Sequence, residues 1–174
     1  MEKTLTPQEY VCGHSNGAFL ANLIGSQLSN RVAAIASVAG TIGLGTKQIP
    51  PPQSPINVLL IHGVADVTVA YDPNVKKAVL NGIGAKAAAE WWANQDGCGP
   101  QPQETTSPNG NVTTLLYSGG KGDTAVELVS IKNGSHSWPG GWTLGQNGKP
   151  VLETTTGVNA ADLIWTFFKD HPKQ

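Results

Sequence analysis

The segment Gly13-His14-Ser15-Asn16-Gly17 places a serine at the centre of a short turn bounded by glycines. It follows an apolar stretch, residues 10–12, and precedes an amphipathic one, residues 18–28. A strand, a tight turn and a helix are the context in which a serine hydroxyl projects from the end of a sheet as a nucleophile. Gly13 and Gly17 lack a Cβ, which allows strand and helix to pass close together. The motif is weak on its own, because a chain with 21 Gly in 174 residues also forms such turns without chemistry.

A serine nucleophile needs a base, and the base needs an acidic partner that orients it. Asp66 follows the apolar run of residues 58–61 and so lies at the carboxyl end of an expected strand. Open α/β sheets place their sites at that end. Asp72 is the alternative, but it precedes Pro73 in an expected turn. The pattern therefore favours Asp66 as the acid.

The chain offers four histidines as candidates for the base. His136 lies in a glycine-rich loop after the last strong strand pattern, where it could reach the serine. His14 flanks the nucleophile and is expected to point to the other side of the turn. We expect His62 to hold a loop as a hydrogen-bond donor, and His171 lies in the C-terminal tail. The pattern favours His136 as the base, and a purely structural histidine remains the alternative.

Three further features would complete a site for acyl transfer. The backbone N–H of Asn16, directly after the nucleophile, is expected to donate to the oxyanion. We expect His14, Trp138 and Trp142 to contact the substrate, the two indoles as an aromatic wall. An equally good explanation for the two indoles is that they pack the loop rather than contact a substrate. The sequence identifies no second oxyanion donor.

Strands alternate with helices along the chain, which predicts an α/β fold with a mostly parallel sheet. Residues 32–38 and 56–61 are continuous apolar runs, as is typical of parallel strands covered on both faces. We expect about four to five strands flanked by helices, in a single domain over residues 1–174. The expected strands are 9–12, 32–38, 56–62, 111–117 and 125–131, and the expected helices are 15–29, 75–95 and 158–170.

The composition restricts the class of partner. The formal net charge is −1 and only 13% of residues are charged, so no basic surface for nucleic acid is expected. The apolar runs are too short to span a bilayer, and the N-terminal residues contain no apolar run of signal-peptide length. Two cysteines do not make a disulfide framework. We expect Cys12 to be a small buried thiol, and we favour free thiols at Cys12 and Cys98 over the alternative of a bridge between them.

Several motifs occur in an order that resembles the polyhydroxybutyrate depolymerase and feruloyl esterase group of α/β-hydrolases. The resemblance covers nearly the whole chain, and the combination is more specific than any one motif. It implies Ser15 as nucleophile, Asp66 as acid and His136 as base in the hydrolysis of carboxylic esters through an acyl-enzyme, with no metal or cofactor. Members of the group are commonly exported. The motifs are Gly13-His-Ser-Asn-Gly-Ala18, His62-Gly-x-x-Asp66, Val69-x-Tyr71, Trp92-x-Asn94-x-x-Gly97-Cys98, His136-Ser-Trp-Pro-Gly-Gly141 and Leu163-Ile-Trp-x-Phe-Phe168.

The chain departs from this group in two ways. The group often has a second Cys shortly after the strand expected at 111–117, where this chain has Ser118-Gly119-Gly120, so the implied disulfide is absent. Members also carry further strands, helices and the second oxyanion donor before the nucleophile strand. The chain thus resembles the C-terminal portion of that fold. Its first strand should be a sheet edge, which we expect a second copy of the chain or a rearranged N-terminus to cover.

The leading functional hypothesis is a serine carboxylesterase for short-chain or aryl esters of the feruloyl or hydroxybutyrate type. The second hypothesis is a non-catalytic fragment or binding module that recognises aromatic or polyester surfaces through its tryptophans. A peptidase or acyltransferase with the same three residues is a weaker alternative, because nothing in the sequence suggests a pocket for an amine substrate.

Overall fold

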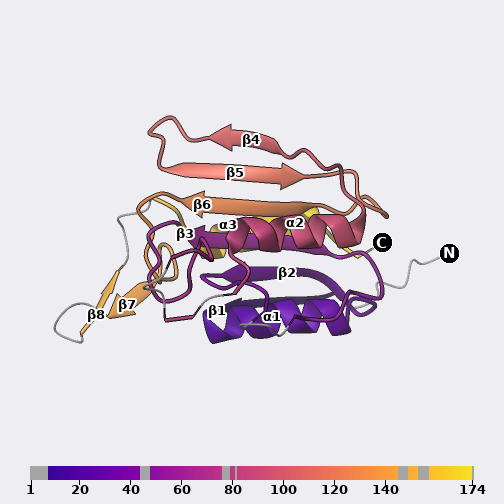
Figure 1. Ribbon diagram of the computed structural model, residues 1–174, viewed down its shortest axis with the longest axis horizontal. Coiled ribbons are helices and arrows are strands. Elements are labelled where there is room, and N and C mark those ends of the chain that lie inside the picture. The colour runs from indigo at the N-terminus through magenta and orange to yellow at the C-terminus, as the bar shows by residue number, and fades with distance from the viewer. Residues whose placement is uncertain are drawn as a thin grey trace.

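A six-stranded mixed sheet organises the computed structural model of the chain (Figure 1). The structure describes residues 8–43, 48–75, 79–80, 82–144, 149–152 and 157–173. The strands of the large sheet are β1 (Glu9–His14), β2 (Val32–Val38), β3 (Asn57–Gly63), β4 (Gln103–Thr106), β5 (Val112–Tyr117) and β6 (Val126–Ile131). The helices are α1 (Asn16–Gln27), α2 (Ala85–Asp96) and α3 (Ala160–Asp170), and β7 (Trp142–Leu144) pairs with β8 (Pro150–Leu152) in a small separate sheet.

The parallel part of the sheet matches the sequence prediction. The strand order is β1-β2-β3-β6-β5-β4, with β1, β2, β3 and β6 parallel. Every residue of β2 and of β3 is buried, as the continuous apolar runs predicted for strands covered on both faces. These parallel strands end at one edge of the sheet, and that edge carries the loops after β1, β3 and β6.

The sheet has six strands rather than the four or five expected, because β4 was missed. β4 pairs antiparallel with β5, which pairs antiparallel with β6. All four residues of β4 are exposed, so this outer strand has no apolar alternation that a sequence pattern could detect. The hairpin of β7 and β8 lies after β6, in a part of the chain where no strand was expected.

Helices cover both faces of the sheet. Figure 1 shows α2 in front of the sheet and α3 behind it. Trp92 of α2 is fully buried in one apolar cluster, against which Ile24 of α1 also packs. Ile164 and Phe167 of α3 belong to the cluster on the other face. These side chains form the apolar stripe of the last helix, and Asn159 caps that helix by accepting from the N–H groups of Ala161 and Asp162.

Two expectations about local structure were wrong. α2 begins at Ala85 rather than at residue 75, because Gly84 has a φ of 86° and the Ile83 N–H bonds back to the Ile42 carbonyl. Residues 76–78 and 81 of that predicted helix lie outside the described residues. Cys12 is exposed rather than buried, because β1 is at the edge of the sheet and α3 packs mainly over β2 and β3. Cys12 and Cys98 are both free, as expected.

No helix in the described part of the chain is long and apolar enough to cross a membrane.

Asp96 at the end of α2 is a buried carboxyl with an unusual environment. One carboxyl oxygen accepts from the Ile56 N–H at 3.2 Å, and the other has no hydrogen-bond partner among the described residues. Burial raises the pKa of Asp96 from 3.8 to about 7, and the Ile56 N–H acts in the opposite direction. The folded protein therefore holds a proton on Asp96 at pH values where the unfolded chain has lost it.

The stability of the protein should fall as the pH rises from about 4 to about 7, because the folded state binds the extra proton in this range. Since one pKa unit corresponds to about 1.4 kcal/mol, the effect on the free energy of unfolding is on the order of 4 kcal/mol. Asp96→Asn keeps an acceptor for Ile56 and removes the titration. In urea unfolding from pH 4 to 8, the free energy of unfolding of the variant should rise relative to that of the parent as the pH rises. A difference between the two that does not change with pH would contradict the raised pKa of Asp96.

Candidate active site

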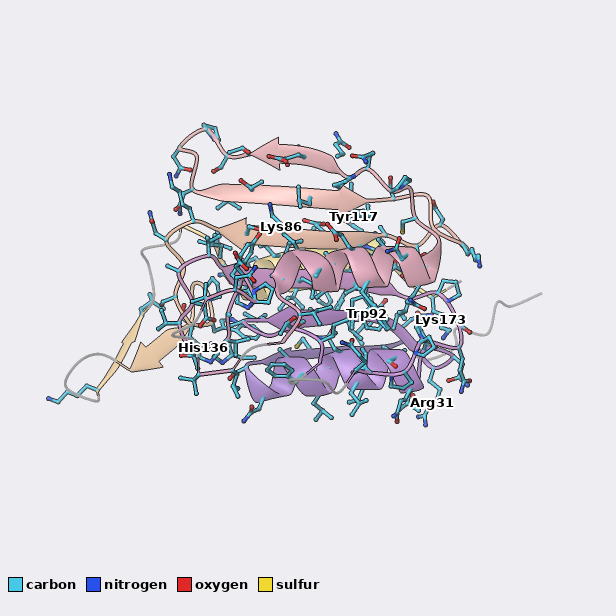
Figure 2. The ribbon with its side chains drawn as sticks, viewed as in Figure 1. Arg31, Lys86, Trp92, Tyr117, His136 and Lys173 are labelled. Carbon is cyan, nitrogen blue, oxygen red and sulfur yellow. The ribbon has the colours of Figure 1, made fainter. Side chains whose placement is uncertain are left out.

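The ends of three parallel strands bring the candidate residues to one edge of the sheet. Ser15 follows β1 directly, Asp66 comes three residues after β3, and His136 comes five residues after β6. Parallel strands have their carboxyl ends on the same side, where α/β proteins place their sites. Figure 2 shows His136 at the opposite end of the molecule from Arg31 and Lys173.

The turn at Ser15 has a strained backbone. Ser15 has a φ of 54°, which is rare outside glycine, and it is the N-cap of α1. Its N–H donates to the Val38 carbonyl at 2.9 Å, and its carbonyl accepts from the Ala18 N–H at 2.9 Å. These two bonds hold the turn between β2 and the first turn of α1.

The two glycines of the turn differ in their steric role. A Cβ on Gly13 would lie 2.2 Å from the Gly17 carbonyl oxygen, whereas a Cβ on Gly17 would meet nothing within 4 Å. The expected close approach of strand and helix is therefore confirmed, but only Gly13 requires the absence of a side chain.

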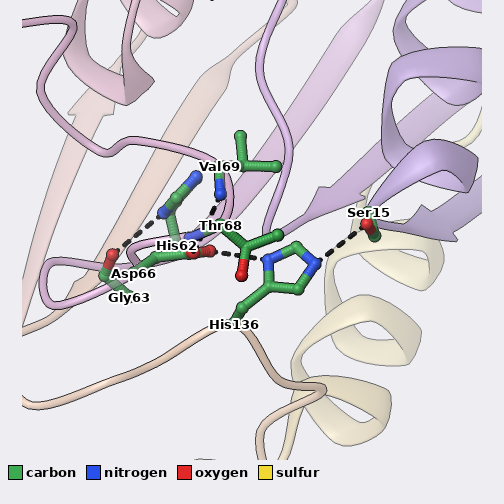
Figure 3. Close-up of polar contacts among 7 residues, drawn as sticks. All are labelled: Ser15, His62, Gly63, Asp66, Thr68, Val69 and His136. Carbon is green, nitrogen blue, oxygen red and sulfur yellow. Dashed lines mark hydrogen bonds and ion pairs between the residues drawn. The ribbon is translucent and has the colours of Figure 1, made fainter. Parts of the chain in front are cut away.

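Asp66 is buried and oriented by its own loop. Its Oδ1 accepts from the backbone N–H groups of Thr68 at 2.8 Å and Val69 at 3.0 Å. Only 3% of the residue is exposed. The two amides fix the carboxylate so that Oδ2 is left to face the loop after β6 (Figure 3).

A contact between two glycines sets the spacing of the loops that carry Asp66 and His136. A Cβ on Gly63 would lie 2.2 Å from the Gly134 carbonyl oxygen, so the two backbones touch. The Ala65 N–H donates to that same Gly134 carbonyl at 3.0 Å. This close approach lets an imidazole on one loop reach a carboxylate on the other.

Ser15, His136 and Asp66 form a continuous hydrogen-bonded chain, which we call the relay (Figure 3). His136 Nδ1 lies 2.8 Å from Asp66 Oδ2, and His136 Nε2 lies 2.9 Å from Ser15 Oγ. Because a carboxylate only accepts, Nδ1–H donates to Asp66 and Nε2 is free to accept from the serine hydroxyl. The structure thus brings together the three residues that the sequence favoured. Asp72, the alternative acid, instead accepts from the backbone and side chain of Asn74 on the surface.

His14 lies on the same side as the relay, and the expectation that it points away was wrong. Its ring centroid is 5.1 Å from that of His136 and 6.5 Å from that of Trp138, which it meets edge to face. His14 Nε2 is buried without a hydrogen-bond partner among the described residues. Burial lowers the pKa of His14, and the neighbouring His136 lowers it further. A neutral His14 therefore borders the relay.

The other two histidines have structural contacts. His62 is buried, and its Nδ1–H donates to the Gly63 carbonyl at 3.0 Å, so it is the loop-holding donor expected. Burial lowers the pKa of His62. His171 Nδ1–H donates to the Phe167 carbonyl at 2.8 Å, so His171 is anchored on α3. In the described part of the chain, no group of three His, Cys, Asp or Glu side chains is arranged to hold a metal ion.

The remaining expected site residues are Asn16, Trp138 and Trp142. Asn16 is the first residue of α1, where a backbone N–H has no acceptor within the helix. Trp138 is half-buried, and it packs against the apolar cluster under α3 as well as beside His14. Trp142 lies in β7, and its side chain falls outside the described part of the structure.

Sequence reasoning missed the groups that orient the acid. The Thr68 and Val69 amides bind Asp66 in the pattern of a side chain that caps its own turn. This turn could have been expected from the sequence, because Asp66 follows a buried strand and is itself followed directly by Val-Thr-Val. Gly63 and Gly134 gave no such signal, because the contact between them joins residues far apart in the chain.

Comparison with known proteins finds similarity to two esterases. Over 137 residues, 74% of this chain, it is 30% identical to feruloyl esterase B of Piromyces equi. The chain is distantly similar to the esterase group of α/β-hydrolases. Over 147 residues, 76% of this chain, it is 27% identical to the protein named "Putative esterase NocK" of Nocardia uniformis subsp. tsuyamanensis. The matched regions span 24% of the first esterase and 42% of the second. No protein-family model matches the chain.

Proposed function

We propose that the chain is a serine hydrolase that cleaves carboxylic esters through an acyl-enzyme. The relay of Ser15, His136 and Asp66 is the observation that carries this proposal. The strained turn at Ser15 and the similarity to two esterases support it. On this proposal, the parallel strands β1, β2, β3 and β6 are the part of an α/β-hydrolase sheet that holds the catalytic residues.

In the first half-reaction, His136 Nε2 takes the hydroxyl proton of Ser15 as Oγ attacks the acyl carbon of the ester. Asp66 holds the ring in the required tautomer and stabilises the imidazolium that forms. The Asn16 N–H donates to the carbonyl oxygen, which becomes negatively charged. His136 then gives the proton to the leaving alcohol as the carbon–oxygen bond of the ester breaks.

In the second half-reaction, a water molecule replaces the alcohol. His136 accepts a proton from this water as its oxygen attacks the acyl carbon of the acyl-enzyme. The bond between that carbon and Ser15 Oγ breaks, and Oγ recovers a proton from His136. The products are the carboxylic acid and the free enzyme, and in each cycle the imidazole accepts a proton twice and gives it up twice.

We propose short-chain or aryl esters, of the feruloyl or hydroxybutyrate type, as the substrate class. His14 and Trp138 lie beside the relay and provide aromatic surface next to the acyl group. Because burial lowers the pKa of His14, this surface is uncharged near neutral pH and suits an apolar acyl group. Trp142 is assigned to the same wall from its place in the loop sequence.

Steady-state hydrolysis of 4-nitrophenyl acetate and of methyl ferulate tests the proposal. The parent chain should turn over both esters, and Ser15→Ala should lose at least about 10⁴-fold in kcat, because no other nucleophile replaces the hydroxyl. Ser137→Ala is the matched control, since Ser137 is a buried serine on the same loop as His136 and outside the relay. Equal rates for the parent and Ser15→Ala would contradict the proposal. Binding of polyester without turnover would favour a binding module.

A further inference from the structure

The helix that follows the nucleophile turn is not held by a cap from its own first side chain. A serine at the N-cap position ordinarily accepts, through its hydroxyl, from a backbone N–H of the first helical turn. Ser15 is the N-cap of α1 but makes no such bond, and its Oγ instead lies 2.9 Å from His136 Nε2. The first turn of α1 also contains no acidic residue. Contacts elsewhere on α1 must therefore fix where this helix begins relative to the sheet.

Small side chains form the buried face of α1 and bring the helix close to β2. A Cβ on Gly25 would lie 2.8 Å from the side chain of Ile35 in β2. A Cβ on Gly40, just after β2, would lie 2.4 Å from the Cβ of Ala18. Small side chains bury little apolar area, so directional polar contacts become more important for the position of the helix. The buried residues of α1 are Ala18, Ala21, Asn22, Gly25 and Ser26.

Asn22 is a polar residue of this face and is fully buried. Its Nδ2 donates to the Ala18 carbonyl at 2.9 Å and to Ser37 Oγ of β2 at 3.0 Å. Its Oδ1 accepts from the indole N–H of Trp92 in α2 at 2.8 Å. The amide fits in this orientation alone, because an indole N–H only donates and a backbone carbonyl only accepts. One side chain thus joins α1 to β2 and to α2.

The contacts of Asn22 lie next to the two backbone hydrogen bonds that hold Ser15. The Ser15 N–H donates to the Val38 carbonyl, and Val38 directly follows Ser37. The Ser15 carbonyl accepts from the Ala18 N–H, and the carbonyl of Ala18 is the one to which Asn22 donates. A shift of α1 along or around its axis would disturb both bonds and, with them, the position of the Ser15 hydroxyl.

We propose that Asn22 is a positioning residue that holds α1 in place, so that Ser15 Oγ stays within hydrogen-bond distance of His136. Its effect on rate rests on the proposed hydrolase function. Asn22 lies outside the relay and acts through the helix. Through its bond to Trp92, α2 also takes part in placing the nucleophile. Because reacting groups must be aligned closely, a displaced helix slows the chemical step more than it weakens substrate binding.

Steady-state hydrolysis of 4-nitrophenyl acetate by Asn22→Ala tests this role. Per mole of folded protein, kcat should fall by about 10- to 100-fold and KM should change by less than about threefold, as expected for a nucleophile displaced by up to about 1 Å. Asn57→Ala is the matched control. Asn57 is also buried and accepts from the Ala125 N–H at 2.9 Å, but it lies at the start of β3, whereas the relay lies beyond the end of that strand. This control should keep the parental kcat.

Trp92→Phe provides a second variant, which removes the indole N–H and keeps an aromatic ring in the core. It should lower kcat by about three- to tenfold, because Asn22 then loses one of its three hydrogen bonds. In the Asn22→Ala background, the same substitution should lower kcat by less than it does in the parent, because the bond is already absent. Independent, multiplicative losses in the double variant would contradict a shared role.

Proton NMR of the His136 ring gives a readout that does not need turnover. Asn22→Ala should shift the ring resonances, which are assigned by their loss in His136→Ala, whereas Asn57→Ala should leave them in place. Parental kcat and unshifted resonances in Asn22→Ala would overturn the positioning role, and so would equal losses of kcat in Asn22→Ala and Asn57→Ala. A parent chain without turnover that depends on Ser15 would contradict the proposed function instead, and the resonances alone would then test the role of Asn22.

Discussion

Replacement of His136 by alanine should lower kcat for 4-nitrophenyl acetate by about 10⁴- to 10⁶-fold. The imidazole is the only group that contacts both Ser15 Oγ and Asp66 among the described residues, at 2.9 Å and 2.8 Å. Without it, the hydroxyl keeps its proton and Asp66 has no ring to orient. Asp66 keeps its hydrogen bonds from the Thr68 and Val69 amides in this variant, so the free energy of unfolding should change less than the activation free energy of hydrolysis.

The control for this prediction is another histidine of the same chain. His171→Ala removes a ring that bonds to the Phe167 carbonyl at the end of α3 and does not touch the relay. This variant should hydrolyse the ester at close to the parental rate. A similar loss of kcat in the two variants would mean that the rate reports folding rather than proton transfer through His136.

Gly13→Ala should destabilise the protein by about 2–4 kcal/mol, the range for severe steric conflict in a packed region. The new Cβ would lie 2.2 Å from the Gly17 carbonyl oxygen, and backbone atoms cannot swing aside as a flexible side chain can. Strand β1 and helix α1 would have to separate, which also moves Ser15 away from His136. Hydrolysis should therefore fall together with the midpoint of thermal unfolding.

Gly17→Ala is the matched variant with the opposite expectation. A Cβ on Gly17 meets nothing within 4 Å, and Gly17 is the second residue of α1. Alanine in a helix is more favourable than glycine by up to about 1 kcal/mol, so this variant should be as stable as the parent or more so. Equal destabilisation by the two substitutions would contradict the described packing of the turn.

The parallel part of the fold could be predicted well because a strand that is buried on both faces consists of a continuous run of apolar residues. β2 spans Val32–Val38, as predicted, whereas β3 lies one residue further along the chain than predicted and β6 begins one residue later. β4 could not be predicted in this way, since its residues Gln103–Thr106 are all exposed and show no apolar pattern. The start of α2 depended on the Ile83–Ile42 contact between distant segments, which local sequence does not encode.

The relay residues could be predicted because each follows a strong strand pattern at a short distance. The surroundings of the relay could not be predicted from the sequence, because they depend on how segments far apart in the chain are placed relative to one another. His14 was expected on the far side of the turn, yet its ring lies 5.1 Å from that of His136. Cys12 was expected to be buried, and its exposure follows from the position of β1 at the sheet edge, which is a property of the whole topology.

Labelling with a fluorophosphonate, followed by mass spectrometry of the modified peptides, tests most directly whether Ser15 is an activated nucleophile. We predict a single covalent adduct on Ser15 in the parent chain, no adduct in Ser15→Ala, and labelling slowed by orders of magnitude in His136→Ala. An unlabelled parent chain that is folded, or a parent labelled on another residue while Ser15 remains unmodified, would contradict the proposed relay chemistry.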